Sequence, residues 1–399
     1  MLRPGTFPLT LLLALLTGMG PLSVDMYLAS LPDMGRLLGA PMSQVQLTIS
    51  FYLFGFAVAQ VFYGPLSDRH GRKPVLLAAL AVYLLATLAC VLTTSIEALI
   101  AARFAQAVGA SGAIVLARAV VRDMYDGPRL GREMSRLSAI MALAPLCAPL
   151  IGGVLLTFFS WRSNFVALFF YGVMATVMVW LLLPETLRQR APEPVSPMSI
   201  LRSYRRFLSQ RVFVIYLGIA ICCMSGLFGW ISTGAFILQD IYGLSALAFG
   251  LTFALASGGY LVGTIISARF VMRWGTGRTM GIGAFFMAAG GIGALLIMTI
   301  GMHEAVGLVV SVSLYMFGMG MVWPQAQAGA LMPFPDRAGA AASLLGFLTQ
   351  TNSAVVGAIL GHMLGGTAWP FAIAFALAGC GALLLWALTR RLRATVAHH

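Results

Sequence analysis

Long apolar runs alternate with short polar segments along the whole chain. Each run has about 20 residues, and at a rise of about 1.5 Å per residue such a helix crosses a hydrocarbon layer about 30 Å thick. We predict twelve spans, near residues 7–27, 44–65, 75–94, 97–119, 134–158, 164–183, 213–236, 248–268, 280–302, 305–325, 339–362 and 369–389. The pattern therefore predicts an all-α, polytopic membrane protein with twelve transmembrane helices.

The longest polar segment divides the apolar runs into six and six. This segment, residues 185–212, contains several prolines and six arginines. We predict an N-terminal six-helix bundle over residues 1–184, a cytoplasmic loop over 185–212 and a C-terminal six-helix bundle over 213–399. A weak internal repeat supports two pseudo-symmetric halves, because a glycine-rich apolar run leads into a basic segment at both 64–73 and 269–278.

The composition excludes a water-soluble protein. Hydrophobic residues make up 60% of the chain and charged residues only 9%, with a mean hydropathy of +0.91, whereas soluble domains carry about 25% charged residues. The apolar runs recur throughout, so a single anchor is excluded as well. We expect the first run to be retained as a helix rather than removed as a signal peptide, because it is long and contains Asp25.

The formal charge of +13 is explained by the membrane rather than by a nucleic-acid partner. When the segment 64–74 is placed inside, all but three of the 25 basic residues fall on that side. The exceptions are Arg36, Arg103 and Arg162. Positive charge gathers on the cytoplasmic side of membrane proteins. We therefore expect both chain termini in the cytoplasm.

The segment from Gly64 to Pro74 is the most distinctive polar stretch. It reads Gly-Pro-Leu-Ser-Asp-Arg-His-Gly-Arg-Lys-Pro. We expect Gly64 and Pro65 to end a helix, Gly71 to adopt a positive φ, and Pro74 to lie in the first turn of the next helix. On charge alone this segment is an ordinary basic loop, and only the order of its residues sets it apart.

That order resembles the loop between helices 2 and 3 of the major facilitator superfamily. The family pattern is Gly-x-Leu-(Ser/Ala)-Asp-Arg-x-Gly-Arg-(Arg/Lys), matched here at Gly64, Leu66, Asp68, Arg69, Gly71, Arg72 and Lys73. The resemblance implies two six-helix halves that rock between inward-open and outward-open states. In one state we expect Asp68 to lie at the start of the helix near Gly339, and Arg69 or Arg72 to pair with Asp123. These contacts would form a latch.

Two further stretches are similar to elements of the same superfamily. The stretch from Arg103 through Gln106 to Gly109 resembles the Arg-x-x-Gln-Gly element of helix 4, with its glycine two residues late. The second stretch, with Pro149, Gly152 and Gly153, resembles the Gly-Pro-x-x-Gly-Gly element of helix 5 that is associated with antiporters, with Ala148 in place of the first glycine. Pro145 and Pro149 each remove a backbone hydrogen bond, so we expect a kinked helix, packed closely at its glycines.

Four other stretches look like the branch of drug–proton antiporters named for bicyclomycin and chloramphenicol resistance. They lie in helix 1 and after helices 4, 6 and 10, and read Asp25-Met-Tyr27-Leu…Leu31-Pro32, Arg118-Ala-Val-Val-Arg122-Asp123, Leu183-Pro-Glu185-Thr-Leu187 and Met332-Pro-Phe-Pro335 before Ala338-Gly339. Val24 and Ala29 depart from the first pattern, where the branch has Thr and Pro. The resemblance implies export of small drugs in exchange for protons.

Two ionisable residues, Asp25 and Arg103, lie inside the predicted spans, where a charged side chain is costly. Each charged side chain at the centre of a helix costs about 2.5–3.5 kcal/mol on insertion scales. Helical rise places Asp25 and Arg103 in the outer half of the membrane at similar height. We hypothesise that Asp25 takes up and releases a proton under the influence of Arg103. The alternatives are a static ion pair between them, or Asp25 capping the helix end near Pro32.

Aromatic, methionine and amide side chains within the spans are candidates for a substrate cavity. These are Tyr27, Tyr52, Met141, Trp230, Gln350 and Asn352. The plainer alternative is that such side chains pack in the core or face lipid.

The sequence therefore predicts a monomeric transporter of the bacterial inner membrane that exports small amphipathic compounds in exchange for protons. We expect no enzyme activity, cofactor or metal, because no histidine or cysteine constellation and no nucleotide-binding glycine loop is present, and the five cysteines lie within apolar spans. Proton-coupled uptake of a small metabolite is the alternative. A channel is disfavoured, because no filter or charged ring recurs.

Overall fold

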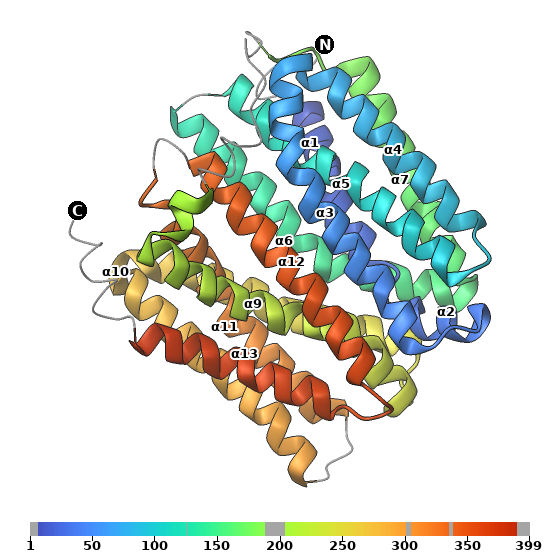
Figure 1. Ribbon diagram of the computed structural model, residues 1–399, viewed down its shortest axis with the longest axis vertical. Helices are drawn as coiled ribbons and strands as arrows, with labels where there is room; N and C mark the ends of the chain where they lie inside the picture. The colour runs from blue at the N-terminus through green and yellow to red at the C-terminus, as the bar shows by residue number, and fades with distance from the viewer. Residues whose placement is uncertain (1–6, 126, 188–203, 301–304, 335–337, 389–399) are drawn as a thin grey trace. The chain divides into compact units, whose positions relative to one another are not determined.

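The computed structural model describes residues 7–125, 127–187, 204–300, 305–334 and 338–388. Every regular element within these stretches is helical (Figure 1). Ten of their helices are long and apolar enough to span a membrane, and one of the ten, Ala246–Ile300, contains two such lengths. A shorter apolar helix covers Leu143–Phe158. The predicted all-α, polytopic architecture is confirmed.

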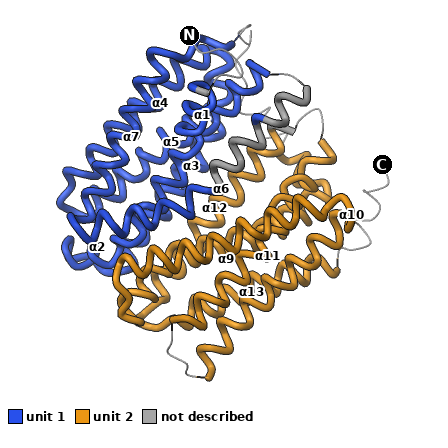
Figure 2. Tube along the Cα trace, turned by 180° about the vertical axis from the view of Figure 1, so that it is seen from behind, with its two compact units in different colours: residues 1–195 blue, residues 196–399 orange. Residues whose placement is uncertain are grey.

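The chain divides into two compact units, Met1–Val195 and Ser196–His399 (Figure 2). Within the described part, unit 1 contains α1 (Phe7–Asp25), η1 (Leu28–Ser30), α2 (Leu31–Leu38), α3 (Met42–His70), α4 (Arg72–Leu92), α5 (Ile96–Met124), α6 (Gly127–Phe158) and α7 (Trp161–Leu182). Unit 2 contains α9 (Arg211–Phe236), η2 (Ile237–Ile241), α10 (Ala246–Ile300), α11 (Ala305–Leu331), α12 (Ala338–Met363) and α13 (Trp369–Leu388). Because α10 is two helices in series, unit 2 has six helices of membrane length. Unit 1 has five, together with α6, whose apolar part is the shorter stretch Leu143–Phe158.

The two units repeat the same pattern of helix packing. In unit 1, α1 packs against α5, α6 and α7, and α4 packs against α5 and α7. In unit 2, α9 packs against α11, α12 and α13, and α10 packs against α11 and α13. Thus α1, α5, α6 and α7 correspond to α9, α11, α12 and α13. The weak repeat in the sequence reflects a repeat in the fold.

A glycine with positive φ marks the same turn in both units. Gly71 separates α3 from α4 with φ 103° and ψ 152°, and Gly275 interrupts α10 with φ 75° and ψ 158°. Side chains strongly disfavour this region of backbone conformation, which glycine enters freely. The expected positive φ at Gly71 is confirmed. Gly275 lies in the segment 269–278, where the repeat predicted a second copy of this turn.

Some predicted boundaries are wrong. Pro65 does not end its helix, because α3 continues to His70. A proline removes one backbone donor, and the hydrogen bonds of the neighbouring turns can still hold the helix together. The segments 248–268 and 280–302 are not separated by a loop, since only Gly275 departs from helical angles. Within the predicted loop 185–212, residues 204–208 are helical and α9 begins at Arg211.

Two short helices follow α1 where the sequence predicted only the end of the first span. The span predicted near 7–27 ends at Asp25, and the chain then forms η1 and the amphipathic helix α2. Gly39 ends α2 with φ 62° and ψ 29°, a left-handed cap that glycine favours. Asp25 is therefore at a helix end with further buried structure beyond it. Leu28, Leu31 and Met34 are all fully buried.

Candidate functional site

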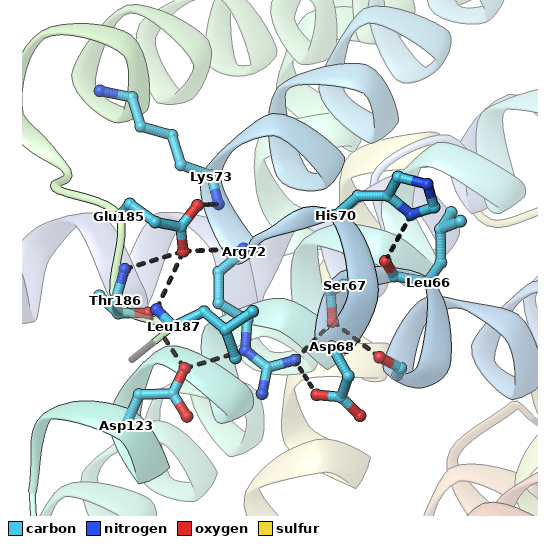
Figure 3. Close-up of polar contacts among 11 residues, drawn as sticks. Leu66, Ser67, Asp68, His70, Arg72, Lys73, Asp123, Glu185, Thr186 and Leu187 are labelled. Carbon is cyan, nitrogen blue, oxygen red and sulfur yellow. Dashed lines mark hydrogen bonds and ion pairs between the residues drawn. The ribbon is translucent and has the colours of Figure 1, made fainter. Parts of the chain in front are cut away.

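The turn between α3 and α4 is built around the guanidinium of Arg72 (Figure 3). Its Nε donates to Asp123 Oδ2 at 2.9 Å, and its Nη1 donates to Ser67 Oγ at 2.6 Å. The same Nη1 lies 2.5 Å from Asp68 Oδ1. Arg72 is only 6% exposed, so two carboxylates and a hydroxyl satisfy a nearly buried charge. Of the two arginines considered as partners of Asp123, Arg72 makes the contact.

The other members of the expected latch contribute differently. Arg69 is exposed, and no hydrogen bond or ion pair joins it to the described residues. Gly64 has open space where a Cβ would lie, and its carbonyl accepts a hydrogen bond from Ser67 Oγ at 2.9 Å. A contact between Asp68 and the start of α12 near Gly339 would join the two units, and it stays a prediction.

Glu185 also belongs to this turn and was missed as a site residue. Its carboxylate accepts hydrogen bonds from the backbone N–H groups of Arg72 and Lys73 (Figure 3). Partial burial acts to raise the pKa of Glu185, but four backbone N–H donors outweigh it and hold the pKa below its ordinary value. The sequence singled out Leu183-Pro-Glu185-Thr-Leu187 only for its resemblance to a family, and nothing in it indicated a partner 113 residues away.

A second cluster surrounds Arg103, deep in unit 1. Arg103 lies on α5 and is 0% exposed. Its guanidinium carbon lies 4.2 Å from the ring centre of Tyr27, 4.3 Å from that of Tyr52 and 5.7 Å from that of Phe165. Nη1 donates to Gln106 Oε1. Aromatic faces attract a desolvated guanidinium, so rings from α3, α7 and the turn after α1 hold this buried cation.

Hydrogen bonds fix the rings around Arg103. The Thr48 hydroxyl donates to the Val45 carbonyl at 2.6 Å, so the Tyr27 hydroxyl, 3.1 Å from Thr48 Oγ1, is the donor to it. The Tyr52 hydroxyl donates to the Gly20 carbonyl at 3.4 Å. Both rings are buried against Arg103 in this conformation. The expectation that they contact substrate stays a prediction.

The same network continues through Gln106 into α4. Gln106 Nε2 donates to Thr87 Oγ1 at 2.8 Å, and the Thr87 hydroxyl donates to the Tyr83 carbonyl. Gln106 came from the same resemblance as Arg103. The structure shows why the two occur three residues apart: one helical turn places the amide oxygen beside the guanidinium.

Asp25, the last residue of α1, is 3% exposed. No ion pair joins it to Arg103 within the described parts of the chain, where the ion pairs are Arg36–Asp33, Arg72–Asp68 and Arg72–Asp123. The alternative of a static ion pair with Arg103 is therefore wrong for this conformation. A buried carboxyl without a cationic partner is costly when ionised, which makes Asp25 the candidate for proton exchange.

Gly152 of α6 lies against the end of α1. A Cβ at Gly152 would overlap the backbone carbonyl of Met26, the residue after Asp25. The close packing expected at these glycines is thus observed at Gly152, next to the candidate proton site. Gly153 is buried, and its carbonyl accepts a hydrogen bond from Thr157. Pro145 and Pro149 both lie inside α6, and the kink expected there stays a prediction.

Three of the remaining cavity candidates belong to unit 2. Trp230 is 1% exposed, and its ring centre lies 6.2 Å from that of Phe253 and 5.9 Å from that of Phe371. Asn352 Nδ2 donates to Ser225 Oγ at 2.9 Å, joining α12 to α9. Gln350 is partly exposed. Met141 lies outside the residues whose side chains the structure describes.

The sequence is similar to bacterial transporters along nearly its whole length. It is 34% identical over 393 residues to the MFS-type transporter YdgK of Bacillus subtilis (strain 168), covering 96% of this chain and 95% of that one. It is 32% identical to Multidrug resistance protein D of Escherichia coli (strain K12), covering 90% of each. It is 29% identical to the Bicyclomycin resistance protein homolog of Haemophilus influenzae (strain ATCC 51907 / DSM 11121 / KW20 / Rd), covering 95% and 94%.

Solved structures of transporters share the fold. A D-xylose–proton symporter superposes with a TM-score of 0.77 at 15% identity, covering 96% of both chains. A POT family transporter in complex with a thioalcohol-conjugated peptide superposes with a TM-score of 0.78 at 12% identity, covering 97% of this chain and 96% of that one. The family model described as Major Facilitator Superfamily matches residues 13–354. The repeat, the Arg72 turn and these matches agree, and the chain belongs to the Major Facilitator Superfamily.

Proposed function

We propose that the protein exports small amphipathic drugs across the bacterial inner membrane in exchange for protons, with both termini in the cytoplasm. The sequence relatives support the export of drugs, since two of them are named for multidrug resistance and bicyclomycin resistance. The observation that carries the coupling to protons is Asp25: a buried carboxyl at the end of α1 that pairs with no cation among the described residues. Membrane-buried acids of this kind mark ion pathways.

In this proposal Asp25 carries the proton and Arg103 supplies a fixed positive charge in the same unit. The aromatic rings and Gln106 hold Arg103 in place without neutralising it. When the cavity opens outward, water and protons reach Asp25, and when it opens inward the proton leaves to the cytoplasm. An ionised Asp25 is tolerated only while water or substrate solvates it. Proton transfer and the change of access are coupled for this reason.

The Arg72 turn acts as the cytoplasmic latch. Arg72 links α4 to Asp123 at the end of α5 and to Asp68 at the end of α3, all within unit 1. We propose that Asp68 also docks on the start of α12 when the cytoplasmic side is closed, using the positive end of that helix. Opening inward breaks this docking. Trp230 and Asn352 contribute substrate contacts from unit 2.

Transport by Asp25→Asn protein tests the coupling. Purified protein is placed in liposomes with an acidic lumen, and uptake of radiolabelled bicyclomycin and of ethidium is recorded as protons leave. We expect wild-type uptake to stop when nigericin removes the pH difference, and Asp25→Asn to abolish proton-driven uptake because an amide cannot exchange a proton.

Asp33→Asn is the matched control. Asp33 lies on α2 eight residues away and pairs with Arg36 on the surface. We expect this variant to retain proton-driven uptake. Undiminished proton release by Asp25→Asn in response to either drug would exclude Asp25 as the carrier, and uptake that persists in wild-type protein without a pH difference would exclude proton exchange.

A further inference from the structure

The helix α4 begins without a cap of its own. Its first residue, Arg72, follows Gly71, which has no side chain to accept a hydrogen bond. The first N–H groups of a helix have no partner within the helix and need one from elsewhere. Here Arg72 N donates to Glu185 Oε1 at 2.9 Å, and Lys73 N donates to Glu185 Oε2 at 3.2 Å. A carboxylate from beyond α7 therefore caps α4, at the end where the helix dipole favours negative charge.

The chain around Glu185 holds this carboxylate in place. Glu185 Oε1 also accepts from the backbone N–H groups of Thr186 at 2.9 Å and Leu187 at 3.0 Å. Pro184 precedes it and has no N–H to compete. The side chain thus bonds forward to its own backbone and across to α4 at once (Figure 3). Its position is determined on both sides.

Gly71 leaves the room that the carboxylate needs. A Cβ at Gly71 would lie 2.5 Å from Glu185 Oε2, closer than real Cβ contacts come. At Gly275, the corresponding turn of unit 2, a Cβ would meet nothing within 4 Å. The two turns have similar backbone angles, and both therefore favour glycine. At Gly71 a side chain is also excluded by the Glu185 carboxylate, and at Gly275 no atom lies close enough to exclude one.

Two side-chain contacts join the same elements. Lys73 Nζ donates to the carbonyl of Trp180 on α7 at 2.9 Å. The Thr186 hydroxyl donates to Asp123 Oδ2 at 3.1 Å, the oxygen that also accepts from Arg72 Nε. The start of α4, the end of α5 and the segment after α7 therefore form one hydrogen-bonded cluster.

We propose that Glu185 is a positioning residue of the transport cycle: by capping α4 it fixes the backbone from which Arg72 reaches Asp68 and Asp123, and it ties the segment leading out of unit 1 to the latch. The inference rests on the proposed function, because it gives the latch a defined anchor. Glu185 touches neither the substrate nor the proton in this scheme. Its effect on transport runs through Arg72.

Amide exchange and transport kinetics of Glu185→Ala test the proposal together. Hydrogen–deuterium exchange is measured in peptides that contain Arg72 and Lys73. The next residue, Pro74, has no backbone N–H and adds no signal of its own. We expect these amides to exchange about tenfold faster in the variant, since a cap contributes about 0.5–2 kcal/mol. We expect bicyclomycin turnover to fall by about fivefold with little change in KM, as for a residue that acts outside the binding site.

Glu97→Ala is the matched control. Glu97 is an exposed acid in the first turn of α5, so the variant also removes an acid near a helix start. We expect wild-type exchange at Arg72 and wild-type turnover. Glu185→Gln keeps the side-chain size and one acceptor oxygen, and we expect intermediate values. If Glu185→Ala does not fold, Glu185→Gln still tests the proposal.

Either of two results overturns the inference: unchanged exchange at Arg72 and Lys73, or faster exchange with wild-type turnover. The second would leave Glu185 as a structural cap only. Turnover is measured as counterflow of radiolabelled bicyclomycin at equal pH on both sides. Counterflow at equal pH needs no proton gradient. A finding that transport by wild-type protein is not coupled to protons would therefore contradict the proposed function without affecting the test of Glu185.

Discussion

Arg103 is the residue whose chemistry depends most on its shape. Its planar guanidinium lies against two tyrosine rings while Nη1 donates to Gln106. A lysine ammonium carries the same charge but cannot lie flat between two rings and reach the amide in the same way. The position therefore requires an arginine and not only a cation.

We expect Arg103→Lys to reduce proton-driven uptake of ethidium by about tenfold, since the lost cation–π contacts contribute about 1–2 kcal/mol when desolvated. The measurement is initial uptake into liposomes at a fixed pH difference. Arg162→Lys is the control, because Arg162 also lies over a ring, 4.3 Å from that of Trp161, and caps α4 through the carbonyls of Val91 and Thr93. It should lower thermal stability with coupling retained. Equal loss of coupling in both variants would contradict a special role for Arg103.

At the scale of elements, the contact between α6 and α1 is set by one glycine. Gly152 lets the α6 backbone meet the carbonyl of Met26, directly after Asp25. Any side chain there must push the two helices apart. The antiporter-type glycine element and the candidate proton site are therefore one structural unit, although they lie far apart in the sequence.

We expect Gly152→Ala to destabilise the protein by about 1–3 kcal/mol, because overpacking displaces backbone at this contact. It should also impair proton-driven uptake, since the displaced carbonyl adjoins Asp25. Thermal unfolding in detergent and uptake in liposomes measure the two effects. In the control, Gly258→Ala, the added Cβ meets open space in a helix, and the change should stay within about 1 kcal/mol of wild type. Wild-type stability in Gly152→Ala would show that α6 does not pack as described.

At the scale of the whole molecule, the two units share a pattern of helix packing but differ in the charged residues at the corresponding turn. In the described part of the chain, both contain six long helices when α10 is counted as two, and these pack in the same pattern. The turn at Gly71 carries Arg72, Asp68, Asp123 and Glu185. At the corresponding positions, the turn at Gly275 has Met272 for Asp68 and Thr276 for Arg72. The repeat preserves the fold while the charged cluster belongs to unit 1.

Substitution of the two turn glycines separates these contributions. Gly71→Ala and Gly275→Ala both place a side chain at a positive φ with ψ near 155°, which costs about 1–3 kcal/mol. Only Gly71→Ala also displaces the Glu185 carboxylate. We therefore expect similar losses of stability from the shared strain, a further loss in Gly71→Ala, and a clear drop in bicyclomycin turnover in Gly71→Ala alone. Equal drops in turnover would argue that the strain, and not the cap, controls transport.

The sequence determined the membrane helices and the positive φ at Gly71. Hydrophobic periodicity and span length report burial directly, and glycine between two helices reports backbone angles. It also singled out Asp25, Arg103, Arg72 and Asp123 as candidates, because charged residues stand out in apolar runs and short motifs keep their spacing. It placed helix ends less well, as Pro65 shows, because a helix can absorb the loss of one donor.

Only the tertiary structure decided which of these residues meet. Glu185 and Arg72 are 113 residues apart, and the rings over Arg103 come from α3, from α7 and from the turn after α1. Hydropathy does not encode which face of a helix meets which neighbour, since lipid and protein interiors are similarly apolar. The cap on α4, the ring enclosure of Arg103 and the burial of Asp25 all follow from packing over long distances in the chain. The sequence supplied the chemical groups, and the fold decided their partners.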